Sequence, residues 1–116
     1  MDRSKLFELT QHIDALPVEC DGASRLTHLA LHRAGIIHQV MMGTVKHGQM
    51  KIPIHWWIQV GKLIIDWRCR MWSGSAAPHG IFLASEHPDY VYSGKPTSFG
   101  LDGCLILESL FCQTEL

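Results

Sequence analysis

Apolar residues recur every three or four positions in two stretches near the amino terminus, which is the spacing of one helix face. The first stretch, residues 5–16, predicts a short amphipathic helix that Pro17 ends. The second stretch, residues 21–34, predicts a longer helix with Gly35 as its C-terminal stop. Cys20 is therefore expected at the entrance of the second helix.

The middle of the chain is rich in β-branched and aromatic residues, which predicts strands. We expect one strand at residues 36–45 and a polar turn or loop at 46–51. Residues 54–60 and 63–67 are predicted to form a β-hairpin, because the glycine and lysine between them suit a two-residue turn. Trp56, Trp67 and Trp72 are expected in the core.

The last third of the chain changes character and gives weaker patterns. Residues 71–100 are rich in Ser, Gly and Pro, which predicts loops with short strands near 81–83 and 90–92. Residues 101–111 are an apolar run that fits either a closing strand or a short helix. Together the patterns predict an α+β fold, in which N-terminal helices pack on an antiparallel sheet.

Composition narrows the range of functions. The chain has 116 residues, which fits a single domain spanning 1–116, and 47% of the residues are hydrophobic and 18% charged. A formal net charge of −1 provides no general attraction for phosphate, so no nucleic-acid partner is expected. There is no secretory signal and no apolar run long enough for a membrane helix, so we expect a cytoplasmic protein without a membrane partner.

The register of the predicted hairpin brings two polar residues together. Counting outward from the two-residue turn places Trp57 opposite Asp66 and His55 opposite Arg68, all on one face. His55 and Asp66 are then diagonal neighbours, close enough for a hydrogen bond. A carboxylate that binds one ring nitrogen orients a catalytic histidine and stabilises its protonated form.

Cys20 is the candidate nucleophile to accompany this pair. A helix entrance supplies backbone N–H groups and positive potential that favour a thiolate and an oxyanion. The flanking carboxylates of Glu19 and Asp21 oppose thiolate formation. The alternative is that Cys20 is a buried structural thiol, with His55 as a satisfied sheet histidine and Asp66 as a strand cap.

The order Cys20, then His55 and Trp57 in a His-x-Trp pattern, then Asp66 at the end of an Ile-Ile-Asp strand resembles a known family. It is similar to the transglutaminase-like branch of the papain-like cysteine protease superfamily. The run Leu-His-Arg-Ala-Gly-Ile at 31–36 resembles the helix-to-strand join of those proteins.

The resemblance covers about residues 18–67 and implies a minimal papain-like domain. It implies Cys20 as nucleophile, His55 as base and Asp66 as orienting residue, acting on a peptide, amide or thioester by hydrolysis or transfer. The substrate would be a peptide or protein acyl group, and no cofactor is required. The second oxyanion donor of that family has no clear match in this sequence, and Gln11 is the candidate for it.

Two neighbours of the triad have open roles. Trp57 either shields the His55–Asp66 bond from water or lines a substrate cleft. Arg68 either receives a substrate carboxylate or pairs with Asp66 and withdraws it from the triad.

Two other functions compete with the enzyme. His28 and His32 have the spacing of a shared metal, but no acidic residue lies between them, so no metal site is predicted. A non-catalytic binding or inhibitor module would use the tryptophan and arginine surface at residues 67–72 to hold a protein partner.

Overall fold

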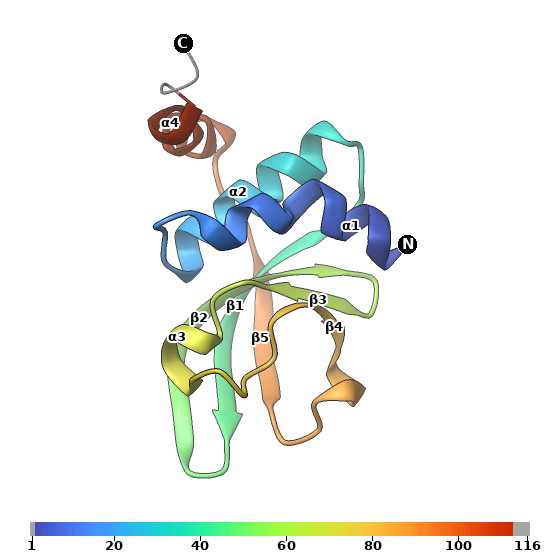
Figure 1. Cartoon of the computed structure of the whole chain (residues 1–116), viewed down its shortest axis with the longest axis vertical. Coiled ribbons are helices and arrows are strands. Elements are labelled where there is room, and N and C mark those ends of the chain that lie inside the picture. The colour runs from blue at the N-terminus through green and yellow to red at the C-terminus, as the bar shows by residue number, and fades with distance from the viewer. Residues whose placement is uncertain (1, 113–116) are drawn as a thin grey trace.

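The computed structural model describes residues 2–112 as an α+β fold with helices on one side of an antiparallel sheet (Figure 1). The predicted order of elements is confirmed in outline. The elements are α1 Arg3–Thr10, the 3₁₀-helix η1 Gln11–Ala15, α2 Cys20–Arg33, β1 Gln39–His47, β2 Met50–Val60, β3 Leu63–Asp66, α3 Arg70–Ser73, β4 Gly80–Leu83, the 3₁₀-helix η2 Ala84–Glu86, β5 Val91–Thr97 and α4 Leu101–Cys112.

The five strands form one sheet in the order β4-β3-β2-β1-β5, and every pair is antiparallel. The predicted hairpin is present: Val60 pairs with Leu63 across the turn at Gly61, whose φ of 58° suits glycine. β1 and β2 form a second hairpin that extends through residues expected to be loop, so strand β2 begins at Met50.

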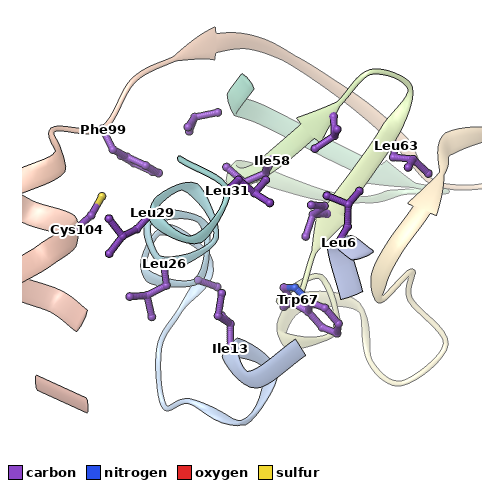
Figure 2. Close-up of a cluster of buried hydrophobic side chains, with 14 residues drawn as sticks. Leu6, Ile13, Leu26, Leu29, Leu31, Ile58, Leu63, Trp67, Phe99 and Cys104 are labelled. Atoms are coloured by element: carbon purple, nitrogen blue, oxygen red, sulfur yellow. The ribbon is translucent and has the colours of Figure 1, made fainter. Parts of the chain in front are cut away.

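The main core lies between the helices and one face of the sheet. Figure 2 shows α2 contributing side chains that approach those of the central strands. Buried alternate residues of β2 and β3, including Ile58 and Ile65, form the sheet side of this core. The labelled members in Figure 2 are Leu6, Ile13, Leu26, Leu29, Leu31, Ile58, Leu63, Trp67, Phe99 and Cys104.

The opposite face of the sheet carries a smaller aromatic cluster. Trp57 and Ile64 come from the central strands, Met41 from β1 and Phe82 from β4, and Tyr92 of β5 packs against them. Successive residues of β2 therefore belong to different cores, with Trp57 in this cluster and Ile58 under the helices. This second face is where the predicted histidine and aspartate belong by alternation.

The last element is a helix, which resolves the ambiguity at residues 101–111. Along α4, buried Cys104 and partly buried Leu107 and Phe111 follow helical spacing and pack against the main core. The placement of α4 beyond α2 is visible in Figure 1. Trp72 departs from prediction, because it lies on the short helix α3 with about half of its surface exposed (51%).

Candidate active site

Three separate elements position the predicted triad. Cys20 is the first residue of α2, His55 lies in β2, and Asp66 is the last residue of β3. The pairing of Ile58 with Ile65, extended by one residue, places Trp57 beside Asp66 and makes His55 its diagonal neighbour. The two-residue turn thus determines which side chains meet.

His55 and Asp66 form a direct hydrogen bond. Nε2 of His55 donates to Oδ2 of Asp66 at 2.7 Å, and the two side chains are 0% and 1% exposed. A buried carboxylate bound to an imidazole fixes the ring orientation and the position of its proton. The contact that was predicted from the hairpin register is therefore present.

Asp66 accepts two further hydrogen bonds. The phenol of Tyr92 donates to Oδ2 at 2.7 Å, and the backbone N–H of Arg68 donates to Oδ1 at 2.9 Å. Tyr92 was not singled out from the sequence, because its place beside Asp66 depends on how β5 pairs with β1. Its predicted location in a short strand near 90–92 was the only signal available.

Cys20 lies close enough to His55 to contribute to the raised pKa of the ring. Because Asp66 occupies Nε2, the other nitrogen, Nδ1, is the one that remains for the thiol. Nδ1 is buried and has no hydrogen-bond partner among residues 2–112. Catalytic hydrogen bonds in unliganded enzymes are often poorly aligned and tighten when substrate binds.

The environment of His55 favours its charged form. Burial lowers the pKa of His55, but hydrogen bonds and negative charge from Asp66 and Cys20 outweigh burial and raise the pKa to about 9. The imidazole is therefore protonated at neutral pH.

The start of α2 leaves backbone donors next to Cys20. The first N–H groups of a helix have no partner within the helix, and the side chain of Glu19, the N-cap residue, makes no capping hydrogen bond. These donors suit an oxyanion. Glu19 and Asp21 are exposed, so water and salt screen the two carboxylates that flank the thiol.

Arg68 does not have either predicted role. β3 ends at Asp66, so strand alternation does not carry the side chain of Arg68 to the face of His55. Arg68 is 7% exposed and its guanidinium is occupied by main-chain carbonyl oxygens of the connection between α1 and α2 and of Trp67. It donates to Ile13 O at 2.9 Å, Leu16 O at 2.7 Å, Val18 O at 2.5 Å and Trp67 O at 2.7 Å.

This guanidinium holds the segment that leads into Cys20. Asp14 lies 3.6 Å from it and also pairs with His79 at 3.0 Å, which ties the same connection to the chain before β4. Burial lowers the pKa of Arg68, and Asp14 and Asp66 oppose that change. Arg68 positions the site and is not free for substrate.

Trp57 and Gln11 also have defined places. Trp57 is 2% exposed and lies against His55, with ring centroids 6.2 Å apart and 27° between the planes. Of its two predicted roles, this burial favours shielding the His55–Asp66 bond from water. Gln11 is exposed at the end of α1, and no hydrogen bond joins its side chain to the triad within residues 2–112.

Among the described residues, no group of three or more His, Cys, Asp and Glu has the arrangement of a metal site. Of the two histidines on α2, His28 instead contacts His38: Nδ1 of His28 lies 2.7 Å from Nε2 of His38. Nδ1 of His38 donates to Ile36 O at 2.6 Å. Burial lowers the pKa of His28, with His38 and His32 adding to the effect.

Comparison with known proteins gives no assignment: no family model, no curated protein and no solved structure matches the chain. Within residues 2–112, every helix is too short or too polar to cross a membrane.

Proposed function

We propose that the protein is a cysteine-dependent acyl hydrolase or acyl transferase with a small papain-like, transglutaminase-like fold. The observation that carries this proposal is the buried His55, which binds Asp66 through Nε2, keeps Nδ1 without a partner among residues 2–112, and has a pKa that Cys20 helps to raise. Cys20, His55 and Asp66 would then supply the nucleophile, the base and the orienting acid that acyl transfer requires.

In the first half-reaction, the Cys20 thiolate attacks the carbonyl carbon of an ester, thioester or amide. The carbonyl oxygen gains the negative charge, and the backbone N–H groups at the start of α2 stabilise it. His55 gives the proton on Nδ1 to the leaving group as the carbon–heteroatom bond breaks. An acyl group joined to Cys20 by a thioester bond remains.

In the second half-reaction, water or an amine attacks the thioester carbonyl. Nδ1 of His55 takes a proton from the attacking group, and the bond from carbon to sulfur breaks to release the acid or the new amide. The Cys20 thiolate and the protonated His55 are restored. Asp66 keeps its hydrogen bond to Nε2 throughout and stabilises the charged ring.

The test is acylation of the protein by para-nitrophenyl acetate, followed by intact mass and peptide mapping. At about pH 6.5 only about one ordinary thiol in a hundred is ionised, so background acylation is slow. The expected result is one acetyl group on Cys20, formed with a burst of nitrophenolate, and loss of the burst in Cys20→Ala.

Cys104 provides a matched control, since it is also a buried cysteine within a helix and lies away from His55 in the main core. Cys104→Ala should keep the burst, and His55→Gln should abolish it while Cys20 is still present. A folded Cys20→Ala protein with an unchanged burst would contradict the proposal.

One observation favours a second candidate, a binding module. α3 exposes Met71 and Trp72 at 50% and 51% next to the exposed Arg70, which is a composition typical of interface anchors. The buried Trp67 and Arg68 cannot belong to such a surface. If this function is the right one, Trp72→Ala should abolish capture of a protein partner, and Cys20→Ala should leave capture unchanged.

A further inference from the structure

We propose that Tyr92 is a positioning residue of this site, which shares the carboxylate oxygen of Asp66 with His55 and moderates how strongly Asp66 holds the ring. The inference rests on the proposed function for its catalytic meaning. The sharing of Asp66 Oδ2 by two donors affects the pKa of His55, which can be measured without turnover.

The geometry makes Tyr92 and His55 competitors for one atom. Both donate to Oδ2 of Asp66, each at 2.7 Å, while Oδ1 is occupied by the backbone of Arg68. With both oxygens engaged, the carboxylate has little freedom to rotate. Charge that Oδ2 shares with the phenol is less available to the imidazole.

Tyr92 can act only as a donor toward Asp66. Burial raises the pKa of Tyr92 far above its usual value, and the charges of Asp66 and Cys69 raise it further. The phenol therefore stays protonated wherever the protein is folded. Its side chain is fixed by packing, because the ring meets Trp57 edge-on with centroids 5.0 Å apart.

The surroundings of the phenol also involve Cys69. Burial and the charge of Asp66 raise the pKa of Cys69, although hydrogen bonds with Tyr92 and Ser73 act in the opposite direction. Asp66 and Cys69 are thus the titratable groups that act on the phenol, and Asp66 and Cys20 those that act on His55. Among these groups, only Asp66 contacts both the phenol and the imidazole by a short hydrogen bond.

The experiment is an NMR titration of the His55 ring in Tyr92→Phe, with the resonance assigned by its absence in His55→Gln. Removing the phenol leaves more charge on Oδ2 for the imidazole. The pKa of His55 should therefore rise above its wild-type value by about half a pH unit to one pH unit. Tyr90→Phe is the matched control, since Tyr90 stacks on His47 at 4.3 Å and Phe preserves that contact.

An unchanged His55 titration in folded Tyr92→Phe would overturn the inference. If Tyr92→Phe does not fold, site-specific fluorotyrosine at position 92 supplies a stronger donor with the same ring, and the pKa of His55 should then fall. No change with fluorotyrosine would also overturn it. Failure of the proposed function is separate: it would appear as acylation that survives Cys20→Ala, whatever the His55 titration gives.

Discussion

Phe82 and Tyr92 lie on strands at opposite edges of the sheet, yet their ring centroids are 5.8 Å apart. In a flat sheet, the four steps from β4 to β5 would separate the edge strands by about 19 Å. The sheet is therefore strongly curled around the aromatic cluster of Trp57. The same curvature lets Tyr92 reach Asp66 from a strand that is three positions away in the sheet.

Two features of β1 accompany this curvature. The register between β1 and β2 shifts between Gly43 and Val45, next to the pair Gly43–His55. A bulge of this kind increases local bending and twist. On the other side of β1, Gly43 pairs with Gly94, and the two backbones are too close for a side chain.

We predict that Gly43→Ala destabilises the protein by about 1 to 3 kcal/mol, the usual cost of overpacking. A Cβ at this position would lie 2.0 Å from the carbonyl oxygen of Ser93, which is backbone and cannot turn away. Urea unfolding measures the loss. Gly100→Ala is the control, because a Cβ there meets nothing within 4 Å; equal costs for the two variants would refute the close approach.

Replacement of Arg68 by Met should cost about 3 to 5 kcal/mol, since several buried carbonyl oxygens lose their donor. Acylation of Cys20 should slow as well, because Val18 and Leu16 lose the hydrogen bonds that hold the chain before α2. The measurements are urea unfolding and the acetylation rate.

Arg70→Met is the comparison for that change. Arg70 is the next arginine along the chain and is exposed, so the expected effect on unfolding is below about 0.5 kcal/mol. An Arg68→Met protein that is as stable as Arg70→Met would show that the four carbonyl contacts contribute nothing.

Stability should fall as pH rises from about 6.5 to about 9. His55 has a pKa of about 9 when folded and 6.5 as its ordinary value, so the folded state holds the proton more tightly. That contribution is complete below pH 6.5 and is lost as pH rises through about 9, for a total of about 3 kcal/mol. Urea unfolding across this range measures it, and the same series on His55→Gln should lack that part of the slope.

Asp66→Asn should lower the pKa of His55, because burial then acts without the opposing carboxylate. We expect the rate of Cys20 acetylation at about pH 7 to fall by about 100-fold or more, as in triads that lose the orienting acid. NMR titration and the nitrophenolate burst give the two values. A normal burst in folded Asp66→Asn would leave the carboxylate with only a structural role.

The His55–Asp66 contact could be predicted from sequence because a two-residue turn fixes the register of its hairpin. Tyr92 could not, since its place depends on β5 pairing with a strand about fifty residues earlier and on curvature that periodicity does not report. The prediction for Arg68 failed because alternation was extended past the end of β3. The apolar run 101–111 left helix and strand open until the packing of Cys104 against the main core distinguished them.

The four carbonyl contacts of Arg68 link the chain before Cys20 to the end of the strand that carries Asp66. The segment before α2 therefore cannot open by itself, because its opening would break the hydrogen bonds of the buried Arg68 guanidinium. Amide exchange at residues 13–18 should therefore occur only through global unfolding of the protein.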